Sequence, residues 1–463
     1  MSVSVAPLSS RQGLVHWYRR NRQRSRALFD LIDPDVYFTR PIALRNPIVF
    51  YEGHLPAFSV ISFLKRGLGR AGVDERLETL FARGIDPDSE QEAVPRSGAG
   101  TRWPSRAAIL EFARAADDEI VAAMERAEFD LTGREHAAMA DGEAIFTALE
   151  HEAMHQETLL YMWRRLPYAH KRQPHDLSYE LGAAPPPNQR IDIPAGRATL
   201  GARRPSTRAD RAAIGAVVPF GWDNEFDALA VDVPRFDIDA HSVTNAEFLE
   251  FIADRGYQRR ELWDDASWEW REAEQVSHPA FWSRTSGSGA AAWAWRGMFE
   301  EIPLPLAWPC YVSQAEASAF ARWKGRRLPS EAEYHRAAYG SPDGEEREFP
   351  WGAAPPQPAH GNFDFQSWEP VPAGARPAGA SAWGVHDLAG NGWEWTASEF
   401  APFPGFTAMA SYPEYSAEFF DGRHVVLKGA SPATAKELIR RSFRNWFRTN
   451  YPYVYAKFRT VSS

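Results

Sequence analysis

The chain has 463 residues, more than one hydrophobic core usually organises, so its length predicts two domains. Hydrophobic residues make up 44% of the chain and charged residues 24%, which excludes a disordered or fibrous protein. The formal net charge of −9 provides no basic surface for nucleic acid, and the lone cysteine, Cys310, excludes an intramolecular disulfide framework and any multi-cysteine metal site.

No apolar run is long enough to cross a membrane, and the first residues, MSVSVAPLSSRQG, lack the apolar stretch of a secretory signal. We therefore expect a cytoplasmic protein with neither membrane nor nucleic-acid partners. The sequence carries no signal for the oligomeric state.

In the first ~170 residues, apolar positions recur at spacings of three and four, the period of amphipathic helices. Joining segments such as GIDPDSEQEAVPRSGAGTRWPS contain Pro, Gly and Ser, which end helices. Four helices predict a bundle, whose interior is a common place for a metal bound by facing helices. They cover roughly residues 12–32, 45–67, 104–127 and 141–166.

The Pro-rich stretch GAAPPPNQRIDIPAG cannot continue a helix and marks a domain boundary. We expect a helical bundle over residues 1–175 and a second domain over residues 176–463. The second part offers short strand-like runs, such as VDVPRFDIDA and HVVLKGAS, and short helices, such as TNAEFLEFIADRG and SQAEASAFARWKG. The expected class is α+β, with a mixed second domain.

A possible metal site lies in the stretch LEHEAMHQETLLYMWRRL, where His151 and His155 are four residues apart. On a helix this spacing places both imidazoles on one face, and nitrogen ligands suit a divalent transition metal. Histidines at this spacing also occur as exposed residues on the surface of a helix. Because Glu152 directly follows the first histidine, as in metalloproteases, a zinc hydrolase is a competing interpretation.

A third histidine, His54, lies in the apolar stretch NPIVFYEGHLPAFSVISFL. A lone histidine among apolar residues is usually a core residue. If this helix neighbours the one that carries the histidine pair, His54 completes a three-histidine face. Glu52 or Glu157 could instead supply a carboxylate ligand.

The chain contains 18 Trp, many of them in the second half. Most are expected to fill the core of a loop-rich domain. A few could line a site for a sugar or a trimethylammonium group.

Four stretches of the second half, VTNAEFLEFI, RRLPSEAEYHRAAYG, GVHDLAGNGWEWTAS and VVLKGASPATAKELIRRSFRNWFR, resemble the formylglycine-generating enzyme family. This resemblance implies a sulfatase-modifying-factor-like fold related to C-type lectins, from about Asp232 onward. Members that generate formylglycine bind copper through two cysteines. Cys310 alone cannot supply that pair, so the chemistry disfavours this activity.

Together with a DinB-like helical bundle that carries three histidines, the chain resembles the sulfoxide synthase superfamily of ergothioneine and ovothiol biosynthesis. FGWDNE, residues 220–225, matches a further segment of that superfamily. The resemblance implies a non-heme Fe(2+) bound by His54, His151 and His155. It also implies O2, hercynine and a chalcogen donor as substrates.

Other positions follow from the same resemblance. The stretch YPEYS implies that Tyr412 or Tyr415 is the active-site phenol that donates a proton or hydrogen atom, with Tyr412 preferred. The stretch RNW implies that Asn445 and Trp446 bind the betaine group of hercynine, where an aromatic face beside a quaternary ammonium is favourable. The alternative for all four residues is packing in an aromatic-rich core.

Two positions depart from the ergothioneine type. Met154 stands where that type has a Gln that contacts hercynine, and Phe447 stands where it can have an Asp for the amino group of its thiol substrate. These departures, with NPIVFYEGHLPAF, resemble the selenoneine synthase branch, which joins hercynine to the selenosugar 1-seleno-β-D-glucose through a selenoxide that yields selenoneine. The alternatives are an ergothioneine-type enzyme that uses cysteine or γ-glutamylcysteine, a zinc hydrolase, or a non-catalytic sugar-binding module.

Overall fold

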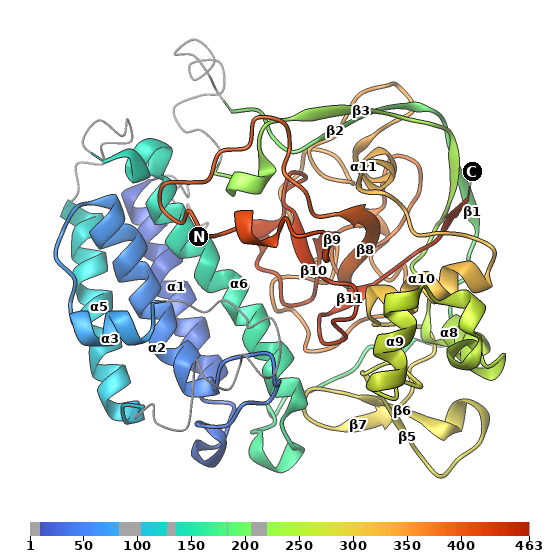
Figure 1. Ribbon diagram of the computed structural model, residues 1–463, viewed down its shortest axis with the longest axis horizontal. Helices are drawn as coiled ribbons and strands as arrows, with labels where there is room; N and C mark the ends of the chain where they lie inside the picture. Colours follow the sequence, from blue (N-terminus) through green and yellow to red (C-terminus); the bar gives the residue numbers. More distant parts are fainter. Residues whose placement is uncertain (1–9, 83–102, 127–135, 183, 205–219, 463) are drawn as a thin grey trace, which may run out of the picture. The chain divides into compact units, whose positions relative to one another are not determined.

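The computed structural model describes residues 10–82, 103–126, 136–182, 184–204 and 220–462 (Figure 1). Contacts divide them into two units. The helical unit contains the described residues up to His175, together with residues 220–222 and Ala408–Tyr415. The mixed unit contains the remaining described residues from Asp176 onward. The boundary expected from the sequence, at residue 175, places residues 220–222 and Ala408–Tyr415 in the second domain. Their contacts place them in the helical unit.

The helical unit contains the four helices expected from the apolar periodicity, and it adds one short helix. The long helices are α1 (Arg11–Phe29), α2 (Ile48–Ser59), α5 (Arg106–Arg126) and α6 (Glu143–Arg165). The short helix is α3 (Glu75–Leu80). Single 3-10 turns form η1 (Pro34–Val36) and η4 (Tyr168–His170), and η3 (Ala137–Gly142) is a kinked 3-10 segment.

Helix α2 is the interior helix of this unit. All 12 of its residues are buried, as expected for a helix that is apolar on every side. Pro56 lies within it and removes one backbone N–H from the helical ladder. The helix continues as η2 (Val60–Gly67), a π-helical segment.

One hydrophobic core joins the other long helices to η2. It contains Ile120 and Met124 of α5, Leu149 of α6 and Phe63 of η2. Each of these side chains is at most 1% exposed. The bundle therefore has a dry interior, in which an unpaired polar side chain is costly.

The mixed unit contains α8 (Asn245–Ala253), α9 (Asp265–Ala273), α10 (Gln314–Trp323) and α11 (Glu331–Tyr339). Three of these helices start with a capping box, in which the hydroxyl of the first residue and the Glu three residues later satisfy each other's backbone N–H groups. The boxes are visible in the sequence as TNAE, SQAE and SEAE.

The strands of the mixed unit are short and form several small sheets. One sheet has the order β1-β4-β12, another β10-β9-β8-β11, a third β5-β6-β7, and β2 pairs with β3. Pairing is antiparallel except between β11 and β8. The strands are β1 (Arg190–Ile193), β2 (Gly196–Leu200), β3 (Leu229–Val233), β4 (Phe236–Asp239), β5 (Trp282–Arg284), β6 (Trp293–Arg296), β7 (Glu301–Pro303), β8 (Gly392–Glu399), β9 (His424–Ala430), β10 (Asn445–Arg448), β11 (Ala456–Lys457) and β12 (Val461–Ser462).

Aromatic side chains fill much of the interior of this unit. Trp295, Trp308 and Trp395 are fully buried. Each indole N–H has an acceptor, so the polar edge of the ring costs little. For these three residues the structural interpretation of the abundant Trp is confirmed.

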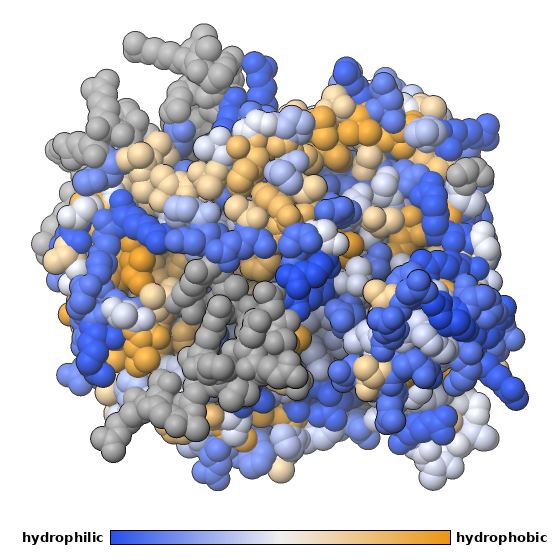
Figure 2. Space-filling view, in the orientation of Figure 1, coloured by the Kyte–Doolittle hydropathy of each residue, from blue (hydrophilic) through white to orange (hydrophobic). Residues whose placement is uncertain are grey.

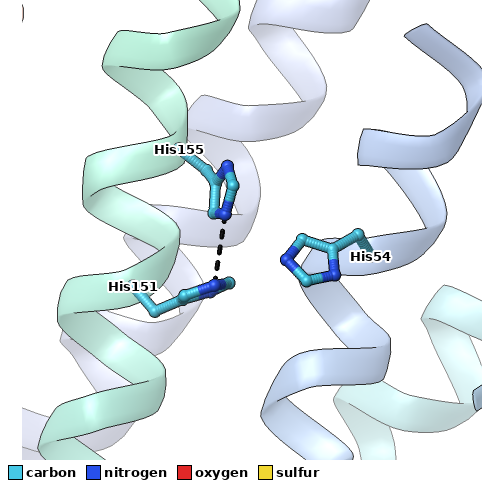
Figure 3. A group of neighbouring side chains, drawn as sticks. All are labelled: His54, His151 and His155. Carbon is cyan, nitrogen blue, oxygen red and sulfur yellow. Dashed lines mark hydrogen bonds between the residues drawn. The ribbon is translucent and has the colours of Figure 1, made fainter. Parts of the chain in front are cut away.

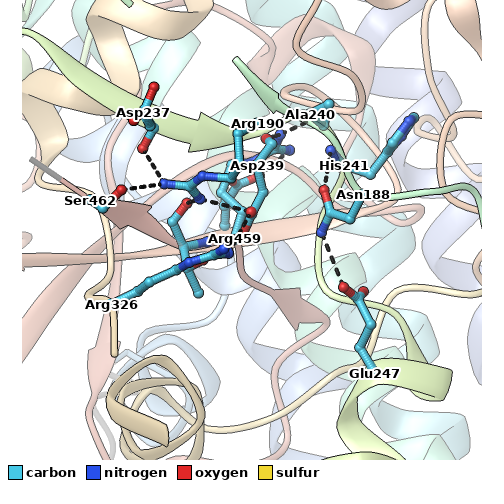
Figure 4. A network of polar contacts seen from close by, with 12 residues as sticks. Asn188, Arg190, Asp237, Asp239, Ala240, His241, Glu247, Arg326, Arg459 and Ser462 are labelled. Carbon is cyan, nitrogen blue, oxygen red and sulfur yellow. Dashed lines mark hydrogen bonds and ion pairs between the residues drawn. The ribbon is translucent and has the colours of Figure 1, made fainter. Parts of the chain in front are cut away.

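A buried polar network ties β1 and β4 to the last residues of the described chain (Figure 4). Asp239 accepts hydrogen bonds from Arg190 and from the backbone N–H of Thr460. Arg459 is fully buried, forms an ion pair with Glu394 and donates to the carbonyl of Asp239. These contacts replace the regular hydrogen bonding that such short strands cannot provide.

The face drawn in Figure 2 shows mostly hydrophilic residues with hydrophobic ones between them. Among the described residues, the large hydrophobic side chains that are exposed are Phe38, Leu181 and Leu306. None of the described helices combines the length and the apolar character needed to span a membrane.

We expect Arg459→Ala to lower the free energy of unfolding by about 3–5 kcal/mol, because a buried ion pair is broken and the carboxylate of Glu394 stays buried. Urea denaturation measures this loss. The control is Arg235→Ala, which removes an exposed ion pair with Asp192 and is expected to change little. Equal effects of the two substitutions would contradict the structural role of the network.

Candidate metal centre

The three predicted histidines converge in the helical unit (Figure 3). His151 and His155 are one turn apart on α6, and His54 projects from α2. One ring nitrogen from each lies within 4.8 Å of the other two, and the Nε2 atoms of His151 and His155 are 3.1 Å apart. Within the described chain, these three side chains form a group that could hold a metal ion.

The orientation of His54 is set by a loop that follows α3. Its Nδ1 lies 2.8 Å from the carbonyl oxygen of Phe81, so Nδ1 carries the proton and Nε2 is the free electron-pair donor. The ring of Phe81 reaches this place because Gly53 has no side chain, since a Cβ there would lie 2.5 Å from that ring. Gly53 and Phe81 thus prepare His54 to be a ligand.

All three imidazoles are neutral near pH 7. Burial lowers the pKa of His54 to about 4. Burial also lowers the pKa of His151 and of His155 well below the usual value, and the neighbouring histidines add to this effect. Neutral imidazole is the form that binds a metal.

Several ring nitrogens of the triad lack a hydrogen-bond partner. Among the described residues, nothing donates to or accepts from Nε2 of His54, Nδ1 of His151 or Nδ1 of His155, although all three atoms are buried. A buried polar atom without a partner is costly. One ring nitrogen from each imidazole can bind the same metal ion, and Nε2 of His54 is a free electron-pair donor, so the donor set fits Fe(2+) or another divalent metal.

The nearby carboxylates are held elsewhere. Glu152 accepts hydrogen bonds from Arg22 and Ser25 of α1, and Glu52 accepts from Tyr37 and Arg106. None of the acidic neighbours belongs to the group that could hold a metal, and Glu157 is bound by Tyr161. Glu152 therefore points toward α1 and not toward a water molecule at the triad.

Aromatic rings cover the histidines. Phe58 stacks on His151 with ring centroids 3.4 Å apart, and Phe50 stacks on His54 at 5.0 Å. The ring of Tyr51 lies 5.7 Å from that of His155. This shell keeps His54 and His151 buried, leaves His155 partly exposed, and fixes the planes of the rings.

Both tyrosines of YPEYS belong to the helical unit, where Tyr412 lies next to His151 and Tyr415 lies next to Tyr412. The ring of Tyr412 is 5.0 Å from Phe58 and 6.1 Å from His151. The phenol of Tyr415 donates to the sulfur of Met154 at 3.5 Å. The site therefore brings together a histidine triad, two phenols and one thioether.

The residues predicted to bind the betaine lie in β10 of the mixed unit. Trp446 stacks on Phe400 at 4.3 Å, and its backbone N–H donates to the side chain of Asn445. Phe447 stacks on Tyr451 at 5.0 Å. The role of Asn445 and Trp446 in binding hercynine stays a prediction.

Sequence reasoning missed the side chains that support the two phenols. The indole N–H of Trp222 donates to Glu150 at 2.9 Å, and Trp222 stacks on Tyr415 at 3.9 Å. Glu143 accepts from both N–H and hydroxyl of Ser411. The only sequence signal was FGWDNE, which contains Trp222 but does not indicate its partner.

Two family models match the chain. Residues 18–159 match the DinB superfamily, and residues 180–463 match the sulfatase-modifying factor enzyme 1-like domain. The chain thus belongs to the class of proteins in which a DinB-like helical domain precedes a sulfatase-modifying-factor-like domain.

Curated relatives extend the match to nearly the whole chain. A hercynine oxygenase of Mycolicibacterium thermoresistibile is 33% identical over 92% of this chain and 89% of its own length. A hercynine oxygenase of Mycobacterium tuberculosis is 41% identical over 51% of this chain and 53% of its own. Ergothioneine biosynthesis protein 1 of Neurospora crassa is 28% identical over 93% of this chain, which spans 55% of that protein. The chain belongs to the ergothioneine-type sulfoxide synthase superfamily, as its motifs predicted.

We expect His155→Ala to abolish tight binding of iron(II), because two imidazoles without a third ligand hold the ion weakly. The measurement is metal content after anaerobic loading and desalting, together with the rise in melting temperature on adding iron(II). His170→Ala, which changes a histidine of the same unit outside the triad, is the control. Full metal content in His155→Ala would refute the assignment of the ligands.

Proposed function

We propose that the chain catalyses oxygen-dependent bond formation between a chalcogen atom and an imidazole carbon of hercynine, with iron(II) bound by His54, His151 and His155. The observation that carries the proposal is the buried triad of neutral histidines next to two phenols. The names of the relatives support hercynine as the substrate. When bound, the iron would supply a redox-active centre that binds oxygen and both organic substrates.

The proposed reaction is balanced with dioxygen as the oxidant. An imidazole C–H bond and a chalcogen–H bond break, and a carbon–chalcogen bond forms. One oxygen atom ends on the chalcogen, as a sulfoxide or selenoxide, and the other leaves as water. No further reductant is needed.

The side chains around the triad have distinct roles in this proposal. The rings of Phe58 and Phe50 hold the histidines in place and keep water away. Tyr412 is the preferred proton or hydrogen-atom donor, because its ring lies next to that of His151. Asn445 and Trp446 are proposed to bind the betaine of hercynine, the latter by cation–π contact.

The donor is a separate question with two candidates. Sulfur donors such as cysteine or γ-glutamylcysteine are supported by the relatives in ergothioneine biosynthesis. A selenosugar, 1-seleno-β-D-glucose, is supported by Phe447, which presents an apolar ring and no charge for an amino group. Met154 presents a thioether, a weak hydrogen-bond acceptor, and it marks a departure from the ergothioneine type on the hercynine side. A donor without an amino group suits Phe447 better.

Two other classes find less support. A zinc hydrolase needs Glu152 as its base, and that carboxylate is bound by Arg22 and Ser25. A non-catalytic sugar-binding module gives no reason for three converging imidazoles that each leave one buried ring nitrogen without a partner among the described residues.

The decisive experiment compares donors. The iron(II)-loaded protein is incubated aerobically with hercynine and with selenoglucose, cysteine or γ-glutamylcysteine, and products are identified by mass spectrometry. The selenosugar candidate predicts turnover with selenoglucose at least tenfold faster, about 1.4 kcal/mol of discrimination. Comparable turnover with γ-glutamylcysteine would refute that candidate, and no product with any donor would refute the proposed function.

We expect Tyr412→Phe to reduce formation of the hercynine product by about a hundredfold, the usual effect of losing a positioned proton donor. The ring contacts with Phe58 and His151 remain, so iron content should not change. Tyr415→Phe is the comparison, and it is expected to have the smaller effect. A larger loss in Tyr415→Phe would transfer the role to that phenol.

A further inference from the structure

Helix α6 carries a second row of functional side chains next to its histidines. Glu143, Thr147, Glu150 and Met154 follow one another at spacings of four, three and four, so they share one side of the helix. We call these four residues the docking row. Each of them contacts residues 220–222 or Ala408–Tyr415, the two late segments of the helical unit.

The first half of the docking row binds Ser411, which is fully buried. Glu143 accepts from the backbone N–H of Ser411 at 2.8 Å and from its hydroxyl at 2.9 Å. The hydroxyl of Thr147 lies 2.9 Å from the same serine oxygen, and Arg66 donates to the carbonyl at 3.1 Å. Every polar atom of the residue before Tyr412 thus has a partner in the bundle.

The second half of the docking row holds Tyr415 from two sides. Glu150 binds the indole N–H of Trp222, whose ring stacks on the ring of Tyr415 at an interplanar angle of 26°. On the other side, the phenol donates to Met154. Glu150 and Met154 flank His151 and precede His155 in sequence, so the metal ligands and the docking row are parts of one rigid helix.

We propose that the docking row positions the two phenols relative to the histidine triad, with Glu143 and Glu150 as the positioning residues. The tyrosine segment Ala408–Tyr415 contains no helix or strand, so its place depends on side-chain contacts. Glu143 fixes Tyr412 through Ser411, and Glu150 fixes Tyr415 through Trp222. The consequence for catalysis rests on the proposed function, whereas the positional claim does not.

The two halves of the docking row can be tested separately, because each supports a different tyrosine. Glu143→Ala removes the carboxylate oxygen that accepts from both the backbone N–H and the hydroxyl of Ser411, and it should release mainly Tyr412. Glu150→Leu removes the acceptor of Trp222 and should release mainly Tyr415. Glu143→Gln and Glu150→Gln each keep a carbonyl acceptor and are expected to restore most of the order.

The matched control is Glu78→Ala. Glu78 is a buried carboxylate of the same unit that also accepts from backbone N–H groups, those of Val73 and Asp74. Because Glu78 is the more deeply buried of the two, its loss should lower stability at least as much as that of Glu143. Among the described residues, none of the hydrogen bonds of Glu78 involves Ala408–Tyr415. A general loss of stability is thereby separated from a loss of positioning.

The experiment places 3-fluorotyrosine at position 412 or 415 of the full chain and records ¹⁹F spectra without paramagnetic metal. We expect one sharp resonance at each position in the unaltered chain and in Glu78→Ala. Glu143→Ala should broaden or split the resonance at 412, and Glu150→Leu should shift that at 415, because the stacked indole no longer holds its place. Unchanged resonances in both variants would overturn the proposal.

Two further measurements keep the test decisive. If Glu143→Ala does not fold, Ser411→Ala removes only the hydroxyl contacts and must still perturb position 412. In the iron-loaded enzyme, Glu143→Ala should lower hercynine product formed per dioxygen consumed by about tenfold or more, with its iron content intact. Altered ¹⁹F spectra without any activity in the unaltered chain would refute the proposed function and leave the positional claim standing.

Discussion

The site depends on the burial of three imidazoles whose nitrogens converge in a dry helical interior. Burial keeps the rings neutral, as the lowered pKa values of His54, His151 and His155 show. It also leaves Nε2 of His54 without a hydrogen-bond partner among the described residues, which is costly unless another group binds that atom. The apolar character of α2 and the aromatic rings of Phe50 and Phe58 follow from the same requirement.

Helix α6 carries the metal ligands, the docking row and the contacts with α1 on three different sides. One side carries His151 and His155, and the docking row lies next to it. A third side faces α1, where Glu152 binds Arg22 and Gln156 binds Asn21. Because one helix carries all three sets, a change in its packing against α1 would move the metal ligands and the supports of the tyrosines together.

Much of the chain in the mixed unit has no regular secondary structure, so other interactions must stabilise it. Buried ion pairs replace regular hydrogen bonding around the segment that leads into β10. Glu225 accepts from Arg440 and Ser442, and Arg444 pairs with Glu331. Asn445 and Trp446 follow directly, so these pairs anchor the strand that carries the predicted betaine-binding residues. A binding surface on irregular backbone needs such an anchor, because loops without one are mobile.

The sequence by itself determined the helices, the capping boxes, the superfamily and the three histidines, because periodicity, turn chemistry and motif spacing are local properties. Only the tertiary structure decided that Glu52, Glu152 and Glu157 are engaged elsewhere and that residues 220–222 and Ala408–Tyr415 belong to the helical unit. The contact of Ser411 with Glu143 spans 268 positions of the chain. No local pattern encodes such a partner, because the pairing exists only once the helical unit has formed and one half-buried carboxylate faces one backbone N–H.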